Sequence, residues 1–230
     1  MKNARILYVE DDLTLSFVTR DNLERAGYVV DFCDDGNVAS EKIAEKKYDL
    51  YILDVMLPKI DGYTLARKIR SRDESVPILF LSAKSTMDDR IYGLQLGADD
   101  YITKPFSIEE LILKIEIFLK RNTIDTGRVQ KEAALQLGGF SFTPSQQQLV
   151  LGTNVQSLTH REAQLLAYLL RNKDHILKRD DILMEVWGND HFFASRSLDV
   201  FISRLRKILK ADPSIRIENI HNIGYRLTIQ

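Results

Sequence analysis

The chain has almost none of the features that support covalent cross-links or membrane anchoring. Cys33 is the only cysteine among 230 residues, so no internal disulfide can form, and we expect its thiol to pack as a small apolar side chain. No apolar run approaches the ~18–20 residues of a membrane span. Residues 1–5 lead straight into a strand-like run, without the longer apolar region of a signal peptide. We therefore expect a cytoplasmic protein that has no membrane partner.

The chain also lacks an excess of charge of one sign, because 32 Lys and Arg residues face 33 Asp and Glu residues. The distribution is uneven, however. Residues 1–121 hold 18 basic and 22 acidic residues, whereas residues 122–230 hold 14 and 11. At ~100–200 residues per domain the length fits one large domain or two small ones, and the mildly basic second half is consistent with an anion-binding domain.

The first half alternates short apolar runs with amphipathic stretches. The runs are rich in Val, Ile, Leu, Tyr and Phe, as strands buried on both faces should be. They lie at Ile6–Val9, Tyr28–Phe32, Leu50–Leu53, Ile78–Leu81 and, more weakly, Tyr101–Thr103. Helical patterns lie between them. Five such units predict an α/β domain over residues 1–121, with a doubly wound five-stranded parallel sheet and helices on both faces.

The pattern changes near residue 122. Residues 122–134 are polar, without a sustained apolar stripe, and we interpret them as a linker. Residues 135–230 then predict a second, α+β domain. Its elements are four short strands within 135–158, helices at 160–171, 179–187 and 195–209, and two final strands at 215–220 and 225–229.

Several chemically useful residues follow the predicted strands of the first domain. In a doubly wound sheet, ligands bind beyond the carboxyl ends of the strands. Glu10 and Asp11 follow the first strand, Asp54 ends the third, Ser82 ends the fourth, and Lys104 follows the fifth. Clustered carboxylates repel one another, and a magnesium ion (Mg2+) bound by oxygen ligands relieves this repulsion. A carboxylate such as Asp54 can also act as a nucleophile and form an aspartyl phosphate.

Each of these residues alone has an ordinary structural explanation. Asp11 or Asp12 can cap a helix, Ser82 can sit in a turn, and Lys104 can be solvated. Three functional alternatives must also be weighed. They are a DNA-binding protein whose acidic pocket is never phosphorylated, an enzyme of the haloacid-dehalogenase kind, and a nucleotide-binding sheet. Such enzymes carry a second Asp where this chain has Met56, and a nucleotide site needs a glycine-rich turn where residues 10–13 are Glu-Asp-Asp-Leu.

The segments ILYVEDD, ILDVMLPKIDGYTLARKIR, PILFLSAK and LGADDYITKPF resemble a response-regulator receiver domain with a CheY-like (flavodoxin-like) fold, and they cover residues 5–121. The resemblance implies that Asp54 accepts a phosphoryl group from a sensor histidine kinase. It also implies that Glu10, Asp11, Asp54 and the Met56 carbonyl hold Mg2+. Ser82 takes the place of the switch hydroxyl, Tyr101 that of the switch aromatic, and Lys104 that of the lysine before a commonly cis proline, Pro105.

The helix predicted at 195–209 has a basic side. Leu198, Ile202 and Leu205 fall on one stripe of a helical wheel, whereas Arg196, Val200, Ser203, Arg204 and Lys207 fall opposite. Such a face suits the DNA major groove, although an ordinary solvated face is the simpler alternative. Three helices between short strands and a terminal hairpin predict a winged helix.

The segments SLTHREAQLLAYLLRN, LKRDDILMEVWG, SRSLDVFISRLRKIL and IENIHNIGYRL resemble the DNA-binding domain of OmpR/PhoB-type regulators. The resemblance implies a recognition helix at 195–209 and a wing at His221-Asn222. It also implies that the loop 189–194, with Phe192 and Phe193, contacts RNA polymerase. The expected DNA-contacting residues are Arg196, Ser197, Val200, Ser203, Arg204, Arg206, Lys207, His221 and Asn222.

Three positions depart from this family's pattern. Phe201 replaces a common His, which we expect to remove a polar DNA contact. His221-Asn222 replaces a common Arg-Gly, which we expect to weaken wing binding in the minor groove. Glu116 replaces a basic residue at a position that we assign to the dimer face, so the usual ion pairs of that face are in doubt.

The sequence as a whole predicts a transcriptional regulator rather than an enzyme. Phosphorylation of Asp54 is expected to promote a homodimer, so that two winged helices bind paired sites in promoter DNA. The expected dimer face consists of Arg90, Asp99, Asp100, Glu110 and Lys114.

Overall fold

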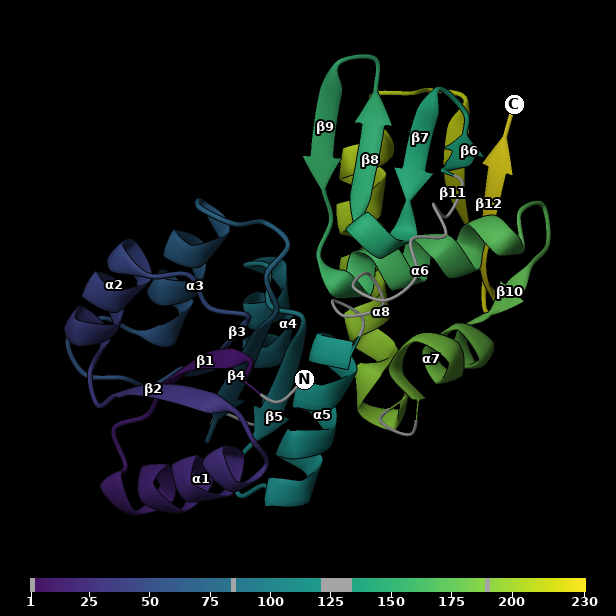
Figure 1. Cartoon of the computed structure of the whole chain (residues 1–230). Coiled ribbons are helices and arrows are strands. Elements are labelled where there is room, and N and C mark those ends of the chain that lie inside the picture. Colours follow the sequence, from purple (N-terminus) through teal and green to yellow (C-terminus); the bar gives the residue numbers. More distant parts are fainter. Residues whose placement is uncertain (1–2, 84–85, 121–133, 189–190) are drawn as a thin grey trace. The chain divides into compact units, whose positions relative to one another are not determined.

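The computed structural model describes residues 3–83, 86–120, 134–188 and 191–230. The chain divides into two compact units, residues 1–129 and 130–230, and each is described by itself (Figure 1). The predicted linker at 122–134 lies outside the described residues except for Ala134.

The apolar runs of the first unit form a five-stranded parallel sheet, as predicted. Its strands are β1 (Arg5–Val9), β2 (Val29–Cys33), β3 (Leu50–Asp54), β4 (Ile78–Ser82) and β5 (Asp100–Thr103). The order across the sheet is β2-β1-β3-β4-β5. The strands are added to one side of β1 first and then to the other, so the order of strands switches between β1 and β3. Side chains that follow these two strands meet at this switch point.

Five helices connect and cover these strands. They are α1 (Leu13–Arg25), α2 (Gly36–Glu45), α3 (Gly62–Arg70), α4 (Met87–Gln95) and α5 (Ile108–Lys120). Four of them begin at a residue whose side-chain oxygen accepts backbone N–H groups of the first turn: Asp12, Asp35, Asp61 and Thr86. The residue that precedes each of these four helices thus also stabilises its first turn.

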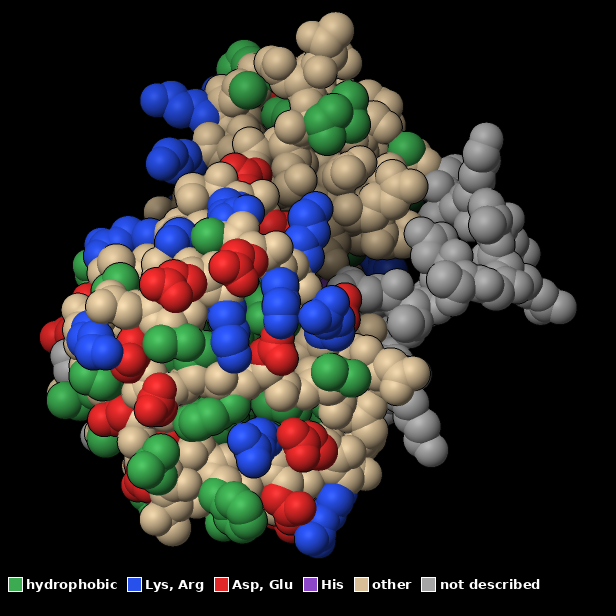
Figure 2. All heavy atoms as spheres, turned by 60° about the vertical axis from the view of Figure 1, so that its left-hand side comes forward, with side chains coloured by type: hydrophobic (Ala, Val, Ile, Leu, Met, Phe, Trp, Pro, Cys, Tyr) green, Lys and Arg blue, Asp and Glu red, His purple; other side chains and the backbone are tan. Residues whose placement is uncertain are grey.

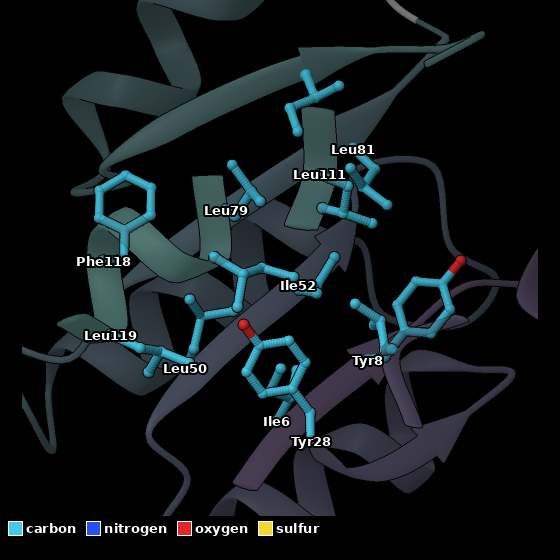
Figure 3. Packing of buried hydrophobic residues seen from close by; sticks show 13 residues of the cluster. Ile6, Tyr8, Tyr28, Leu50, Ile52, Leu79, Leu81, Leu111, Phe118 and Leu119 are labelled. Carbon is cyan, nitrogen blue, oxygen red and sulfur yellow. The ribbon is translucent and has the colours of Figure 1, made fainter. Parts of the chain in front are cut away.

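The sheet is apolar on both faces because each strand alternates its side chains between two helical layers. Ile6 and Tyr8 of β1 pack on the side of α1 and α5, together with Leu50 and Ile52 of β3. Figure 3 shows this cluster, in which α5 contributes Leu111, Phe118 and Leu119. The alternate side chains of the same strands, such as Leu7 and Leu53, are also completely buried. The doubly wound prediction is confirmed.

Strand β2 differs from the expectation that the first four strands are buried on both faces. Val29 is 46% exposed, and only Cys33 of this strand is fully buried. Strand β2 lies at the edge of the sheet and pairs with β1 alone. The Cys33 thiol is enclosed, as the composition led us to expect.

The second unit opens with a four-stranded antiparallel sheet of β6 (Leu135–Leu137), β7 (Phe140–Thr143), β8 (Gln148–Leu151) and β9 (Asn154–Ser157). Next come α6 (His160–Arg171), β10 (Leu177–Lys178), α7 (Arg179–Trp187), α8 (His191–Leu209), β11 (Ile215–Ile220) and β12 (Gly224–Ile229). Strands β11 and β12 form the terminal hairpin, and β10 pairs with β12. The predicted α+β arrangement is confirmed.

One predicted boundary in this unit, the start of the third helix, was wrong. Helix α8 begins at His191 rather than near residue 195. Residues 191–194 of the predicted loop 189–194 therefore belong to the helix, and residues 189–190 lie outside the described residues. The side chains of Phe192 and Phe193 are not described either, so the expected RNA polymerase contact is not tested.

The surface seen in Figure 2 carries mixed charge over the first unit, with Lys and Arg side chains interspersed among Asp and Glu. Among the described helices, none combines the length and the apolar character that crossing a membrane demands.

Candidate functional site

Four side chains from four different strands meet at the carboxyl edge of the first sheet. Glu10 follows β1, Asp54 ends β3, Ser82 ends β4, and Lys104 follows β5. Glu10 and Ser82 are completely buried, and Asp54 is 4% exposed. The sheet order brings β1 and β3 next to each other, and this adjacency places the two carboxylates side by side.

Lys104 is the counter-ion of this site. Its ammonium nitrogen lies 2.6 Å from the Glu10 carboxylate and 2.5 Å from Oδ2 of Asp54. Burial raises the pKa of Glu10 to about 7, although the hydrogen bond from Lys104 opposes this change. Burial lowers the pKa of Lys104, but hydrogen bonds to Asp54 and Glu10 outweigh it, so this pKa is raised. The peptide bond between Lys104 and Pro105 is cis, as the resemblance implied.

A third carboxylate completes an acidic cluster. Carboxylate oxygens of Glu10, Asp11 and Asp54 all lie within 4.8 Å of one another. Lys104 neutralises only one of these three charges, and oxygen atoms at this spacing are the ligands that Mg2+ prefers. The residues thus fit the ion that the resemblance implies.

Asp12 has a different task from its neighbour. Oδ1 of Asp12 accepts hydrogen bonds from the backbone N–H groups of Thr14 and Leu15, at 2.9 and 3.0 Å. The sequence left open whether Asp11 or Asp12 caps the helix, and the structure assigns the cap to Asp12. The Asp11 side chain is the exposed member of the acidic cluster instead.

The loop after β3 fixes the orientation of the Asp54 carboxylate. The backbone N–H of Met56 donates to Oδ1 of Asp54 at 2.8 Å, while Oδ2 contacts Lys104. Each carboxylate oxygen of Asp54 therefore has its own hydrogen-bond donor, and the two bonds hold the carboxylate plane at the edge of the sheet.

Gly62 allows α3 to begin directly against the residue that carries this carboxylate. A Cβ atom at Gly62 would lie 2.1 Å from the carbonyl oxygen of Asp54, a distance that no real contact shows. The close approach therefore requires a glycine.

We expect Gly62→Ala to shift the end of β3 away from α3. The variant should lose roughly 1–3 kcal/mol of stability, the usual cost of overpacking, and it should accept less phosphoryl group at Asp54. Urea unfolding of the whole chain and intact mass after phosphorylation measure the two effects. Wild-type values for both would contradict the close approach.

Ser82 and Tyr101 are in direct contact beside this cluster. The Tyr101 hydroxyl is hydrogen-bonded to Ser82 and to Tyr63, and its ring is 3% exposed. The ring therefore lies inside the domain, where it packs against Phe80 at 6.1 Å between centroids.

The residues of the predicted dimer face do not all lie at the surface. Asp99 is completely buried, and its Oδ2 accepts from Arg70 at 2.8 Å and from the backbone N–H of Ile78 at 3.1 Å. Its assignment to the dimer face was wrong, because the carboxylate is used to join β5, α3 and the start of β4. Asp100 and Lys114 form an internal ion pair at 2.9 Å, and each is less than 10% exposed. Arg90 and Glu110 are partly exposed.

Glu116 lies on a different side of α5 from Lys114. Two positions along a helix correspond to about 200° of rotation. Lys114 reaches β5, whereas Glu116 is close enough to Tyr28 to raise the pKa of that phenol, to which burial contributes more. The prediction that Glu116 lies on the dimer face and changes its ion pairs is not tested.

Helix α8 of the second unit has more buried sides than the helical wheel predicted. Ser197 and Val200 are each 7% exposed, so little of either side chain is accessible in this structure, and their assignment as DNA contacts stays a prediction. The physical reason is that α8 packs against α6 and α7 on one side and against β11 on another, and only a narrow stripe remains outside. The exposed residues of this stripe, within the described side chains, are Asp199, Ser203, Arg206 and Lys207.

The arginines of α8 have partners inside the unit. Nε of Arg204 lies 2.8 Å from Glu162, a residue of α6 that is only 3% exposed. The guanidinium of Arg206 donates twice to the carbonyl oxygen of Ile217, at 2.9 and 2.6 Å. Asp199 accepts from Arg179 at 2.7 Å, so it orients a neighbouring arginine. The Arg196 side chain lies outside the described residues.

Phe201 is a core residue. It is completely buried, and its ring centroid lies 5.6 Å from that of Trp187 at the end of α7. This position faces α7 rather than the exposed stripe, and the expected loss of a polar DNA contact at Phe201 stays a prediction.

The wing is the exposed turn between β11 and β12. His221 and Asn222 are both exposed there. Asn222 has a φ of 59°, in the left-handed region where Asn is the most readily tolerated residue after Gly. The Asn that replaces the family's common Gly therefore keeps the turn, and only the His replaces a cation.

Sequence reasoning missed three residues of these sites. Tyr63 touches Tyr101, Arg70 holds Asp99, and Arg179 holds Asp199. Each lies on a helix distant in sequence from its partner, so helical periodicity alone gives no signal for it.

Comparisons with known proteins match both units. Residues 6–116 match the family of the response regulator receiver domain, and residues 153–227 match the family described as transcriptional regulatory protein, C terminal. The chain is 43% identical to the transcriptional regulatory protein RprY of Bacteroides fragilis, over 98% of this chain and 95% of the relative. It is 37% identical to the alkaline phosphatase synthesis transcriptional regulatory protein PhoP of Bacillus subtilis, over 98% and 97%. A solved structure of a RitR mutant is 26% identical, with a TM-score of 0.74 over 99% of this chain and all of that chain.

The receiver family matches the first unit, and the C-terminal regulatory family matches the second. A receiver domain implies a kinase partner and generally binds Mg2+ at an acidic site, and the C-terminal family implies DNA binding. The relatives are transcriptional regulators rather than enzymes. The chain therefore belongs to the OmpR/PhoB family of two-component response regulators, in which a receiver domain is joined to a DNA-binding domain that regulates transcription.

Proposed function

We propose that Asp54 is the phosphoacceptor through which a sensor histidine kinase controls DNA binding by this chain. The observation that carries the proposal is the placement of Asp54 at the end of β3, within 2.5 Å of the Lys104 ammonium and beside two further carboxylates. In the transfer, a carboxylate oxygen of Asp54 forms a bond to phosphorus. The bond from phosphorus to the donor imidazole breaks, and the electron pair stays on the leaving nitrogen.

The residues that would hold Mg2+ are Glu10, Asp11, Asp54 and the backbone carbonyl of Met56. When bound, the ion neutralises negative charge on the phosphoryl oxygens. Lys104 already contacts Asp54, and its ammonium can pair with the charge that the phosphoryl group brings. The N–H of Met56 holds the other carboxylate oxygen in place.

We expect Asp11→Asn to weaken Mg2+ binding about tenfold, because it removes one charged ligand from the cluster. Asp12→Asn is the matched control. It makes the same change of charge one residue away, and Asn caps a helix as well as Asp does, so the Mg2+ affinity should stay near the wild-type value. Calorimetric titration with Mg2+ measures both. Equal affinities for the two variants would remove Asp11 from the ligand set.

We propose Ser82 and Tyr101 as the switch. Phosphorylation adds about −1.5 to −2 charges at Asp54. Ser82 ends the adjacent strand β4, and its hydroxyl gains a strong hydrogen-bond acceptor in the phosphoryl oxygens. Because Ser82 is hydrogen-bonded to Tyr101, a change at Ser82 alters the contacts of the Tyr101 ring. The hydroxyl and the ring thus form one element that a local charge can bias.

The face of α4, β5 and α5 is our proposed dimer interface. We retain Arg90, Asp100, Glu110 and Lys114 in it and remove Asp99. Pairing of two chains raises the effective concentration of the second DNA-binding unit and so increases affinity for paired sites without new contacts.

For DNA we propose contacts from the exposed stripe of α8 and from the wing. Ser203, Arg206 and Lys207 lie on this stripe, and His221 and Asn222 form the wing. We retain Arg196 and Arg204 as candidates, although Arg204 is held by Glu162. We also propose that segment 189–194 contacts RNA polymerase. The proposed domains span 1–121 and 135–230, with a linker at 122–134. The proposed site of action is the cytoplasm, where promoter DNA is.

The test follows DNA binding in the two phosphorylation states. Wild type and Asp54→Ala are incubated with acetyl phosphate and Mg2+, mixed with genomic fragments at one fixed salt concentration, and recovered with the bound DNA. The salt is fixed because affinity for DNA falls steeply with it. Phosphorylated wild type should enrich specific fragments above the untreated protein, whereas Asp54→Ala should not respond. The same enrichment with and without acetyl phosphate would contradict the proposed control.

A further inference from the structure

Tyr63 stands between the switch residues and helix α4. It lies in the first turn of α3, and only 9% of it is exposed. Its ring meets the rings of Phe80 on β4 and Tyr92 on α4 edge to face, at 5.2 and 5.0 Å between centroids. The ring therefore packs against the sheet and the helix at once.

The Tyr63 hydroxyl makes two contacts that join the same elements. It donates to the backbone carbonyl oxygen of Asp89 in α4 at 3.1 Å. It is also hydrogen-bonded to the hydroxyl of Tyr101, which is in turn hydrogen-bonded to Ser82. A continuous chain of hydrogen bonds thus runs from the end of β4 through two tyrosines to the first turn of α4.

Helix α4 comes close to Tyr63 at a glycine. A Cβ atom at Gly93 would lie 3.3 Å from a ring carbon of Tyr63 and 3.1 Å from one of Phe80. Any larger side chain would press on both rings. The distance of α4 from the sheet at this point is therefore set by the Tyr63 and Phe80 rings rather than by a side chain of α4.

We propose that Tyr63 is the positioning residue that holds Tyr101 inside the domain and transmits the state of the Ser82–Tyr101 pair to helix α4. The inference rests on the proposed function of Asp54, Ser82 and Tyr101 and extends it to a residue of α3. Arg90 of α4 lies 5.9 Å from the centre of the Tyr101 ring and is the rival contact between Tyr101 and this helix.

The experiment measures hydrogen exchange of backbone amides in residues 86–97 of the full chain, before and after treatment with acetyl phosphate and Mg2+. Intact mass of the same samples gives the extent of phosphorylation. Tyr63→Phe keeps the ring and its edge-to-face contacts but removes the hydroxyl. Tyr92→Phe is the matched control, because it removes a hydroxyl from the 44% exposed ring of the same cluster.

In wild type and Tyr92→Phe, phosphorylation should change the exchange rate of α4 to the same degree. In Tyr63→Phe the effect of phosphorylation should be smaller: the ratio of the α4 exchange rates with and without phosphorylation should fall about fivefold. This is the factor expected when the free energy of one net hydrogen bond no longer favours one position of α4. Phosphoryl incorporation should be similar in all three proteins. An unchanged ratio in Tyr63→Phe would overturn the inference and leave Arg90 as the contact to α4.

A double-mutant cycle separates positioning through Tyr101 from a simple support of α4. If Tyr63 acts through Tyr101, adding Tyr63→Phe to Tyr101→Phe should have little further effect on the ratio. Additive effects would show that Tyr63 supports α4 on its own, which contradicts the proposal. Phosphorylated wild type with unchanged exchange in α4 would also contradict it. A wild type that accepts no phosphoryl group at all would instead contradict the proposed function.

Discussion

Replacement of Lys104 by alanine should destabilise the first domain by about 3 kcal/mol in the absence of Mg2+, because it leaves two buried carboxylates without their counter-ion. Glu10 is completely buried and Asp54 is 4% exposed, so water cannot replace the ammonium. For a domain of this size the loss corresponds to a fall of roughly 10 °C in the melting temperature. Thermal unfolding followed by circular dichroism measures it.

This loss should depend on pH in a defined direction. The folded-state pKa of Glu10 is about 7, raised by burial above its ordinary value of 4.5, so the folded state binds a proton that the unfolded state has already released. Stability therefore rises as the pH falls through this range. Without Lys104, which lowers this pKa, the effect should be larger. We expect Lys104→Ala to be most destabilised at pH 8 and to recover part of its stability at pH 6 or with millimolar Mg2+.

Lys59→Ala is the control for Lys104→Ala. Lys59 lies 2.7 Å from Asp35, but its side chain is 58% exposed, and exposed ion pairs contribute little to stability. Its melting temperature should stay close to that of wild type at both pH values. An equal loss for the two variants, or a loss for Lys104→Ala that is the same at pH 6 and pH 8, would contradict this electrostatic account of the site.

Arg204→Ala should destabilise the second domain by about 3 kcal/mol, because it leaves the Glu162 carboxylate buried without its cation. The side chain of Glu162 is 4% exposed, and Nε of Arg204 lies 2.8 Å from it. Glu162 also takes part in the reciprocal hydrogen bonds with Thr159 that begin α6, so the lost partner affects the start of that helix. Urea unfolding of the full chain should show an earlier transition for the second domain.

Lys207→Ala tests the other side of the same helix. Lys207 lies on the exposed stripe of α8, so its removal should leave the unfolding transition unchanged. If it contacts a phosphate, DNA affinity should fall uniformly across sequences, and the dependence of log K on log salt should lose about one unit of slope. The reverse pattern, with stability lost in Lys207→Ala and kept in Arg204→Ala, would show that the two residues have been assigned to the wrong sides.

The receiver domain was predictable because the same residues determine both its fold and its site. A strand buried on both faces has a clear apolar signature, and Glu10, Asp54, Ser82 and Lys104 follow such strands directly. Once the order of strands is known, the carboxyl ends must meet. The exposure of β2 was not predictable from its composition, because its apolar residues resemble those of the buried strands.

Helix α8 was predicted less well because a helical wheel assumes one buried side. Val200 and Phe201 are buried against elements that lie far away in the sequence, and Arg204 pairs with a residue of α6. A wheel orders residues around the axis but cannot show which directions a neighbouring helix or hairpin will cover. The same reason explains Asp99 and Tyr63, whose partners Arg70 and Tyr101 lie on other elements.

The measurement that tests the central claim most directly is the intact mass of the chain after incubation with acetyl phosphate and Mg2+, for wild type and for Asp54→Ala. The account predicts one added phosphoryl group on wild type and none on the variant. Wild type without an adduct, even at short times and low temperature, would contradict the claim that Asp54 is the phosphoacceptor. An equal adduct on Asp54→Ala would contradict it as well.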